Sequence, residues 1–267
     1  MKDEIGDYCK VIENKQRIYL DSDKPIIIRL DGKSFHTWTK SFDYPYSVEL
    51  KNIFRKTLLS LVENINCIII GYYQSDEVTL VLGGYKDNSE QLFKGNIQKI
   101  TSTSASIFTA IFNKYAQEWN YSNNTKLWNN SQGKYGCMKE LPLAFFDSRV
   151  FQVKESDIET VLWWRLMDAK RNSVSTLAQS LYSPKELHGK MNSEMKEMII
   201  QKGKDWDKEP NEYKQGFWLI KKPIEIGTPN GLVIRNKYFI EDDLCIKDYL
   251  MSIGIECETK QNILENE

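Results

Sequence analysis

The sequence predicts an α/β fold, of the α+β kind, with a ferredoxin-like antiparallel sheet, and three observations support this prediction. Strand-like and helix-like segments follow one another in the order β-α-β-β-α-β, which is the split βαβ arrangement. The 267 residues are 41% hydrophobic and 27% charged, as in chains that fold around a core. The longest uninterrupted apolar runs are only as long as strands, so we expect no membrane-spanning segment and no membrane partner.

Four segments are expected to form the strands of this sheet. The first, Pro25–Asp31, is a β-branched run that begins with a proline. The second strand is Cys67–Tyr73, and the third is Glu77–Leu82, which alternates apolar and polar side chains. Residues 143–153 form the fourth strand, with a bend expected near Ser148.

Helices are expected between these strands. Residues 46–63 place apolar side chains at helical spacing. A longer helix is predicted from Ser89, which can cap it, to about Trp119. Residues 120–140 are rich in Asn, Ser and Gly, which indicates a loop before the fourth strand.

The chain is expected to form a catalytic core and an extension packed on it. The core comprises residues 1–155, of which residues 1–24 are polar and begin with a helix. The extension comprises residues 156–267, with helices over 156–180 and 183–202 and then a charged, β-rich part. No internal repeat and no Pro/Gly/Ser linker separates the two.

Charge, cysteine and histidine content exclude several classes of site. Lys and Arg number 36 and Asp and Glu 37, so the net charge is −1 and a uniformly basic nucleic-acid coat is excluded, although a local basic patch is not. The five cysteines are scattered without a C-x-x-C pair, and the chain has two histidines, which disfavours disulfide frameworks, thiolate zinc sites and multi-histidine sites. Any metal is therefore expected to be held by oxygen, as Mg²⁺ or Mn²⁺.

The N-terminal residues predict an intracellular protein. They read Met-Lys-Asp-Glu-Ile-Gly-Asp, with no apolar segment of a secretory signal and more acid than is typical of a transit peptide. We expect a cytoplasmic location and leave an organellar one open.

Acidic side chains from two distant segments are predicted to meet at one edge of the sheet. In a ferredoxin-like sheet of strand order 4-1-3-2, the end of the first strand lies beside the start of the third. Asp31 ends the first strand, and Asp76 and Glu77 begin the third. Such carboxylates would repel each other, and a pair of divalent cations of the kind used in phosphoryl or nucleotidyl transfer would relieve that repulsion. Each segment alone is more typical of an ordinary turn, so the prediction depends on their joint placement.

Basic and small residues near this edge could bind phosphate. Gly32 allows its backbone to approach a metal or a phosphate, and His36 follows shortly after it. The alternative to a functional role for His36 is an incidental polar contact. His188 is followed by Gly189, which indicates a tight turn that could hold RNA or, equally, a plain helix end. The basic side chains expected around the sheet are Lys33, Lys94, Lys99, Arg149, Arg165, Lys170 and Arg171. The alternative is that they lie on solvated helix surface, which applies above all to Lys94.

The chain also carries the spaced motifs of a known family. Ile28-Arg-Leu-Asp-Gly-Lys-Ser-Phe-His36 and Gly71-Tyr-Tyr-Gln-Ser-Asp-Glu77 resemble the signature of the tRNA-histidine guanylyltransferase superfamily, whose members add nucleotides in the 3′-to-5′ direction. Further matches follow in order within residues 1–222: Lys99, Phe146-Asp-Ser-Arg-Val150, Trp164-Arg165 with Asp168, Arg171-Asn-Ser173 and Lys185-Glu-Leu-His-Gly-Lys190. The spaced set is specific, whereas an Asp-Gly pair alone would be weak.

Three departures from the family pattern bear on the reaction. Lys170-Arg-Asn-Ser173 stands where eukaryotic guanylyltransferases have His-Ile-Asn-Asn, and it resembles the guanylyltransferase-like branch, whose members repair 5′-truncated tRNA by templated addition. Asn96 replaces a frequent arginine, which implies the loss of one phosphate contact. Tyr44-Pro-Tyr46 replaces the more usual Pro-Phe-Asp or Pro-Asn-Asp.

The resemblance implies a polymerase-type palm that repairs the 5′ end of tRNA. ATP would adenylylate a 5′-monophosphate, and the 3′-hydroxyl of the incoming nucleotide would then attack that phosphate so that AMP leaves. A 5′-triphosphate end would react directly with loss of pyrophosphate. The implied cofactors are two Mg²⁺ ions, or Mn²⁺; the implied partners are tRNA, ATP, GTP and other nucleoside triphosphates, and the implied assembly is a homotetramer.

The resemblance also implies the roles of individual residues. Asp31, Asp76 and Glu77 would be catalytic, and Asp31, Asp76 and the Gly32 carbonyl would hold the metals, with Glu77 the weaker candidate. The residues implied to bind the nucleotide are Gly32, Lys33, Ser34, Phe35, His36, Ser75 and Lys99. Those implied to contact the triphosphate or the RNA are Arg149, Arg165, Arg171, Asn172, Ser173, His188 and Lys190.

Three other functions remain open at the level of the sequence. One is the addition of a single G to the 5′ end of histidine tRNA. A palm-fold nucleotide cyclase would use the same two carboxylates without RNA. A non-enzymatic RNA-binding module on this fold would display aromatic side chains on its central strands, as Tyr72 and Tyr73 could, but it would not need an acidic pair at a strand edge.

Overall fold

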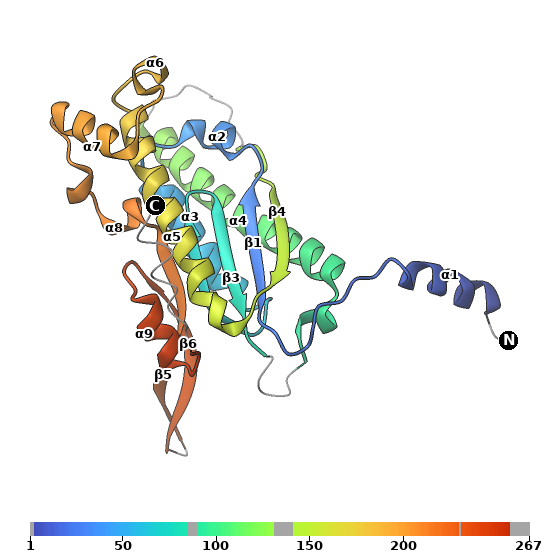
Figure 1. The fold of residues 1–267 in the computed structure, drawn as a ribbon. Helices are drawn as coiled ribbons and strands as arrows, with labels where there is room; N and C mark the ends of the chain where they lie inside the picture. The colour runs from blue at the N-terminus through green and yellow to red at the C-terminus, as the bar shows by residue number, and fades with distance from the viewer. Residues whose placement is uncertain (1–2, 85–89, 131–140, 230, 257–267) are drawn as a thin grey trace.

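The protein is built on one six-stranded antiparallel sheet with the strand order β4-β1-β3-β2-β5-β6 (Figure 1). The computed structural model describes residues 3–84, 90–130, 141–229 and 231–256. The first four strands have the predicted order 4-1-3-2, so the ferredoxin-like arrangement is confirmed. The strands are β1 (Ile26–Gly32), β2 (Ile68–Gln74), β3 (Glu77–Leu82), β4 (Phe146–Gln152), β5 (Phe217–Thr228) and β6 (Gly231–Glu241).

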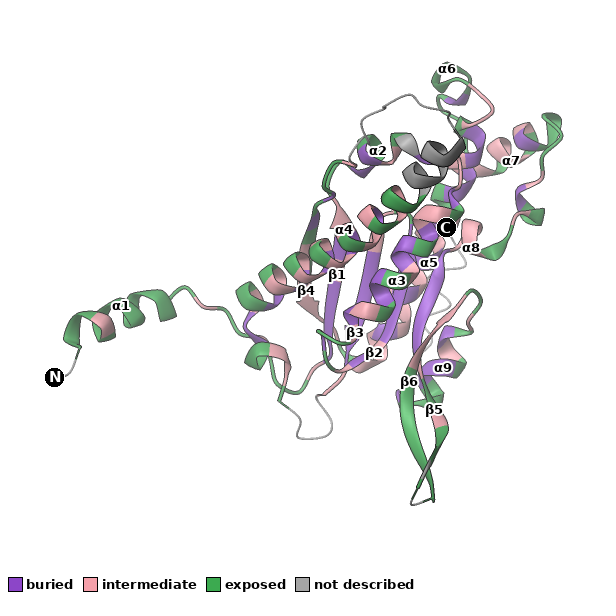
Figure 2. Cartoon of the chain, turned by 180° about the vertical axis from the view of Figure 1, so that it is seen from behind, coloured by how far each residue is buried: buried purple, intermediate pink, exposed green. Residues whose placement is uncertain are grey.

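Helices cover both faces of the sheet, with α3 and α4 on one face and α5 and α9 on the other (Figures 1 and 2). The α-helices are α1 (Glu4–Asn14), α2 (Phe35–Trp38), α3 (Val48–Leu61), α4 (Ile97–Asn130), α5 (Ile158–Gln179), α6 (Pro184–Leu187), α7 (Asn192–Gln201), α8 (Asn211–Lys214) and α9 (Ile246–Ser252). Short 3₁₀ turns are η1 (Thr39–Ser41), η2 (Leu92–Gly95), η3 (Glu155–Asp157) and η4 (Trp206–Lys208). No helix in the described ranges is both long and apolar enough to cross a membrane.

Alternation along β1 decides which side chains face which layer. Ile26, Ile28 and Leu30 join the core beneath α3 and α4, whereas Ile27 joins the core beneath α5 and α9. Because successive side chains of a strand point to opposite faces, Arg29 and Asp31 share the α5 side with Ile27. The strand therefore brings two charged residues, Arg29 and Asp31, to the face that α5 covers.

The helix before β4 is longer than predicted and begins later. Ser89 lies outside the described residues, and α4 starts after Asn96, whose Oδ1 accepts the backbone N–H of Lys99 at 3.0 Å. Asn96 is buried and caps this helix, which is a structural reason for an asparagine at the position. Residues 120–130 are helical, so the loop prediction is wrong there, because the helix continues past the predicted stop; residues 131–140 of that loop lie outside the described part of the chain.

Two other predictions are corrected in the second half of the chain. Residues 183–202 form two helices, α6 and α7, because the chain leaves helical geometry at His188 and Gly189 has a φ of +75°. The expected bend at Ser148 is absent: β4 pairs with β1 residue by residue from Gly32 to Ile26 without a register shift.

The C-terminal hairpin extends the sheet beyond β2. Strand β5 pairs with β2, and the Tyr72 and Tyr73 rings pack on Trp218 and Phe217, with ring centroids 4.3 Å apart in each pair. Gly216 precedes β5 with a φ of +74°, and a Cβ there would lie 1.8 Å from the Tyr73 carbonyl oxygen, so only glycine fits. Since both tyrosines are buried in this contact, they cannot display the stacking surface that the RNA-binding-module alternative needs.

Candidate active site

The predicted acidic edge forms at the ends of β1 and β3. Asp31 pairs with Glu77 across the two strands, and the Gly32 N–H donates to the Asp76 carbonyl at 3.1 Å. Burial raises the pKa of Asp76, and the charge of Asp31 raises it further, while a hydrogen bond with Ser75 opposes the shift. The Asp31 and Asp76 carboxylates are thus close enough to repel each other, as the topology predicts.

Gly32 is required by the way the chain turns after β1. A Cβ at this position would lie 2.6 Å from the Phe35 ring, which is itself buried against Phe54 and Phe146. Ser34 has a φ of +52°, and the chain then enters the short helix α2. The segment 32–36 is therefore a tight turn anchored by a buried ring, which holds its backbone beside Asp31.

A cavity of about 560 Å³ opens beside Asp76. One wall is the turn that follows β1, another is α5, and the floor is formed by α3 and by the segment that leads into β5. Nine of its lining residues belong to the sets implied by the motifs or stand where the chain departs from them: Phe35, His36, Tyr44, Pro45, Tyr46, Ser75, Asp76, Asn172 and Ser173. Its size suits a nucleotide base with its sugar, within the usual range of ligand pockets.

Lys51 is a buried cation on the floor of this cavity, and it belongs to none of the motifs. Its side chain is 10% exposed, its Nζ lies 3.9 Å from a Glu212 carboxylate oxygen, and it sits 2.9 Å from the centroid of the Tyr213 ring. Among the described residues, Nζ has no hydrogen-bond acceptor. Burial lowers the pKa of Lys51 to about 7, with Glu212 opposing that shift and Arg55 adding to it.

A signal for Lys51 is present in the sequence. Lys51, Phe54 and Leu58 follow the i, i+3, i+7 spacing of the buried face of α3, so a lysine interrupts an otherwise apolar stripe. The sequence could not show its surroundings, because Glu212 and Tyr213 come from a segment some hundred and sixty residues away.

Replacing Lys51 by methionine is expected to stabilise the fold. Methionine fills a similar volume without a buried, unpaired donor, which ordinarily costs about 1–3 kcal/mol. Glu212 keeps its ion pair with Arg55 at 2.6 Å, so the substitution does not leave that carboxylate alone. Between pH 7 and the ordinary lysine pKa of 10.5, Lys51 is protonated in the unfolded protein but largely neutral in the folded one. The free energy of unfolding of the wild-type protein therefore rises as the pH rises across this range. The increase in the free energy of unfolding caused by Lys51→Met is therefore largest at pH 7 and below, and it becomes smaller toward pH 10.

Chemical denaturation of both proteins at pH 6.5, 8 and 9.5 measures this effect. Lys56→Met, on an exposed position of the same helix, is the control and should change stability little and equally at every pH. A loss of stability in Lys51→Met, or a difference from wild type that does not depend on pH, would contradict the assignment.

The Glu77 side chain points toward α5, and an arginine of that helix binds its carboxylate. Arg165 donates from Nε to Oε1 at 2.6 Å and from Nη2 to Oε2 at 2.8 Å, and Arg29 lies 3.8 Å from Oε2. Arg165 is buried and also contacts Asp168 at 3.2 Å. The pair joins α5 to the start of β3, immediately after Asp76, so both residues hold the acidic edge in place.

Comparison with known proteins identifies the family of this fold and site. A family model described as tRNAHis guanylyltransferase matches residues 6–154, more than half of the chain. The chain belongs to this family. Two solved structures of bacterial tRNA(His) guanylyltransferase (Thg1)-like proteins, one in complex with ATP and one with GTP, are 29% and 30% identical to it, with TM-scores of 0.77 and 0.73, and each alignment covers 94% of this chain and 97% of that chain. The tRNA(His) guanylyltransferase of Schizosaccharomyces pombe is 25% identical over 233 residues, 82% of this chain and 81% of that protein.

The family membership confirms that the protein is a nucleotidyltransferase of the guanylyltransferase family. Its acidic edge suits a hard divalent cation, because Mg²⁺ is commonly bound by one or two carboxylates together with substrate phosphates and water. Asp31 and Asp76 supply two carboxylates, and a cation would neutralise the repulsion that helps to raise the pKa of Asp76. In the described ranges no group of three or more His, Cys, Asp and Glu side chains is arranged to hold a metal, so further ligands would be backbone, phosphate or water oxygens.

Several of the implied nucleotide and RNA residues lie at this edge. Arg149 is half-exposed on β4, with Nη2 3.5 Å from Asp31 Oδ2. Lys33 and Ser34 are exposed in the turn after β1. On α5, Asn172 lines the cavity and donates to Asp168 at 3.3 Å.

The Ser173 hydroxyl makes its contacts with other parts of the protein. It is buried, and its hydroxyl lies 2.8 Å from the Lys170 carbonyl, 2.9 Å from the Lys214 carbonyl and 3.1 Å from the Trp206 Nε1 that donates to it. The hydroxyl therefore ties α5 to η4 and to α8, and α8 lines the cavity.

Three residues that the resemblance implies in nucleotide or RNA binding lie away from this cavity in the single chain. Lys99 is in the first turn of α4, near Glu13 and Tyr19, and the pKa values of both are lowered mainly by a hydrogen bond with Arg17 and slightly by the charge of Lys99. That end of the molecule adjoins the start of β1, about 17 Å of strand away from Asp31. His188 and Lys190 are exposed at the end of α6, where Lys190 pairs with Glu194 at 3.0 Å.

Proposed function

We propose that the protein adds nucleotides in the 3′-to-5′ direction to the 5′ end of truncated tRNA, with the opposite RNA strand as template. The observation that supports this most directly is the convergence of Asp31 and Asp76 beside a cavity of nucleotide size. The related bacterial proteins described above are complexed with ATP and GTP, which agrees with nucleotide binding at this place.

Two consecutive phosphoryl transfers make up the proposed reaction. ATP reacts with the 5′-monophosphate of the RNA, and an adenylylated 5′ end forms as pyrophosphate leaves. The 3′-hydroxyl of the incoming nucleoside triphosphate then attacks the 5′-phosphate, the bond to AMP breaks, and the new end carries a triphosphate. That triphosphate would react directly in the next addition with loss of pyrophosphate.

The residues of the acidic edge have distinct roles in this proposal. Asp31, Asp76 and the Gly32 carbonyl would hold two Mg²⁺ ions, which supply charge neutralisation and activation of the attacking hydroxyl. The cavity orients the base and sugar of the incoming nucleotide through the turn 32–36 and Ser75. Arg149, beside Asp31, would neutralise phosphate charge, and Glu77 positions the edge through Arg165. Positioning and charge neutralisation account for most of the rate in such reactions.

Template direction is supported by the segment Lys170–Ser173 on α5. This segment lacks the histidine that eukaryotic guanylyltransferases carry, and Arg171 and Asn172 both contact Asp168. Nucleotide choice would then come from base pairing with the opposite strand, where a mismatch leaves polar groups unpaired at roughly 1–3 kcal/mol each. That corresponds to about a ten- to hundredfold preference for the complementary nucleotide.

Truncated tRNAs that differ only in the nucleotide opposite the missing 5′ position test this function. With a 5′-monophosphate, ATP, Mg²⁺ and an equal mixture of nucleoside triphosphates, we expect the product to lengthen by the complementary nucleotide and to change when the template nucleotide changes. Addition of G whatever lies opposite, with a preference for the histidine anticodon, would show instead the single-G reaction. A cyclic nucleotide formed without RNA would point to a cyclase. Size-exclusion chromatography with light scattering in the same buffer tests the proposed homotetramer.

A further inference from the structure

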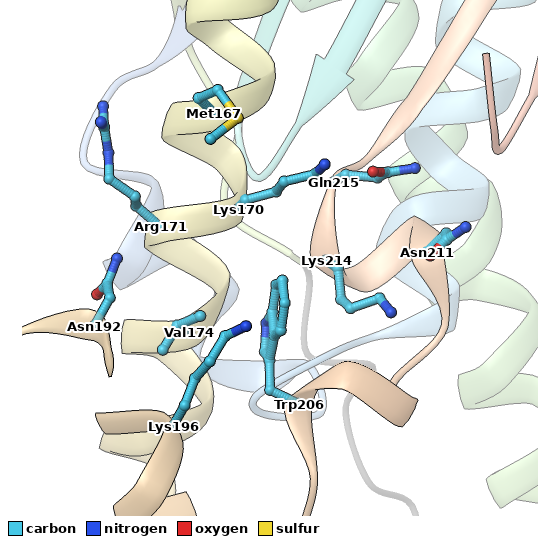
Figure 3. Close-up of a pocket in the computed structure, with 10 residues that line it drawn as sticks. All are labelled: Met167, Lys170, Arg171, Val174, Asn192, Lys196, Trp206, Asn211, Lys214 and Gln215. Carbon is cyan, nitrogen blue, oxygen red and sulfur yellow. The ribbon is translucent and has the colours of Figure 1, made fainter. Parts of the chain in front are cut away.

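A second cavity, of about 430 Å³, lies on the outer side of α5, between this helix, α7, η4 and α8 (Figure 3). We call it the α5–α7 pocket. It is separate from the cavity beside Asp76, which we call the nucleotide cavity, although Lys214 lines both. Lys170 and Arg171 on its α5 side belong to the motif segment discussed above, whereas Lys196, Trp206 and Lys214 have no role in the proposed reaction.

Basic side chains from three separate elements line this pocket. Figure 3 shows Lys170 of α5, Lys196 of α7 and Lys214 of α8 placed around the Trp206 ring, while Arg171 points away from them. Among the described residues that line it, there is no Asp or Glu. In a chain of net charge −1, three lysines and an arginine around one pocket are a local concentration of positive charge.

The few acceptors near these lysines do not balance their charge. Asp207 pairs with Lys196 at 3.0 Å, and its backbone carbonyl accepts from Lys214 Nζ at 2.8 Å. Lys170 forms no ion pair with any carboxylate in the described ranges. Among the described residues, only Lys196 of these three lysines pairs with a carboxylate, so the pocket has an excess of positive charge available to a ligand.

Trp206 holds two of the lysines in place. Lys196 Nζ lies 3.9 Å and Lys214 Nζ 5.4 Å from the centroid of its ring, within the range of a cation–π contact. The ring is buried, and its Nε1 donates to Ser173 Oγ at 3.1 Å, which fixes it against α5. Because lysines occupy the space over the ring, the pocket is arranged to bind phosphate and not to stack a base.

We propose that the α5–α7 pocket binds backbone phosphates of the RNA whose 5′ end is extended. This inference rests on the proposed function for the identity of the RNA. The wall between the two cavities is α5 itself: Asn172 lines the nucleotide cavity, and Lys170 lines the pocket. An RNA held with its 5′ end at Asp31 and Asp76 needs cations outside that site, because each of its phosphates carries a charge.

The test is the binding of 5′-truncated tRNA to Lys170→Gln, Lys196→Gln and the double variant at several salt concentrations. Each single change should weaken RNA binding about tenfold at low salt and lower the salt slope, log K against log[salt], by about 1. Lys170→Arg and Lys196→Arg should restore binding. The control, Lys94→Gln, removes an exposed lysine of η2 that pairs with Glu90 at 3.2 Å, and it should leave both quantities unchanged.

Two further measurements separate the possible results. For Lys196→Gln, whose lysine lies outside the motif segments, ATP affinity and the extension rate at saturating RNA should stay at wild-type values, while KM for RNA rises. Unchanged RNA affinity and salt slope in the double variant, with a wild-type melting temperature, would overturn the proposal. A loss of ATP affinity without a loss of RNA affinity would also overturn it, since the phosphate would then belong to a free nucleotide. Binding needs no turnover, so it can still be measured if the wild-type protein fails to extend tRNA, a result that would refute only the proposed function.

Discussion

Asp76→Asn and Asp31→Asn are each expected to remove nucleotide addition, by about 10³-fold or more, while the fold is kept. Each change removes one anionic oxygen of the proposed metal site, so that the charge of the transition state is poorly compensated, a loss of several kcal/mol. In Asp76→Asn the melting temperature without metal should not fall, because the folded state disfavours the charged form: burial and Asp31 raise the pKa of this carboxyl.

Extension assays and metal titrations together test this expectation. Wild-type protein should gain thermal stability when Mg²⁺ or Mn²⁺ is added with a nucleoside triphosphate, and both variants should lose that gain. Asp147→Asn is the matched control: it lies opposite Asp31 on β4, is exposed, and changes the charge at the same edge by the same amount. A folded Asp31 or Asp76 variant that extends RNA at close to the wild-type rate would refute the two-metal assignment.

Arg165→Met is expected to cost about 3–5 kcal/mol in the free energy of unfolding. The substitution leaves Glu77 buried without its bidentate partner, and breaking a buried ion pair from one side costs about that much. The pKa of Glu77, which burial already raises, should rise further once the arginine is absent. For a chain of this size the melting temperature should fall by roughly 10 °C.

A double-mutant cycle with Glu77→Gln isolates the pair. The double variant should recover a large part of the loss, because an amide needs less compensation in this place than a carboxylate. Arg171→Met, an exposed arginine of the same helix that lies 3.5 Å from Asp168, should cost no more than about 1 kcal/mol. A similar small cost for Arg165→Met would show that the pair does not hold α5 to β3.

The acidic edge is the part of the site that local sequence predicts well. Asp31 lies near the end of β1, and Asp76 directly precedes β3. The type and length of both strands follow from their β-branched and alternating residues, and the strand order then places the two carboxylates together. The turn at Ser75, whose φ is +55°, also follows from local rules, because backbone conformation at this point depends on the residue and its neighbours.

The C-terminal part of the site was harder to predict. Gly216, Glu212 and Tyr213 line the nucleotide cavity, yet their segment carries no recognised motif. The length of α4 was also underestimated, because polar residues after Trp119 are compatible with either a loop or a solvated helix.

By itself the sequence determined the sheet order of the first four strands, the position of the two carboxylates and the family, because each depends on hydrophobic periodicity, topology or spaced motifs. Only the tertiary structure decided what surrounds each polar side chain. It placed Glu77 on Arg165, buried Lys51 beneath Tyr213, made Ser173 a structural contact and gathered Lys170, Lys196 and Lys214 around Trp206. Burial and partners set the charge state and role of a polar group, and these partners come from segments that are brought together only when the chain folds.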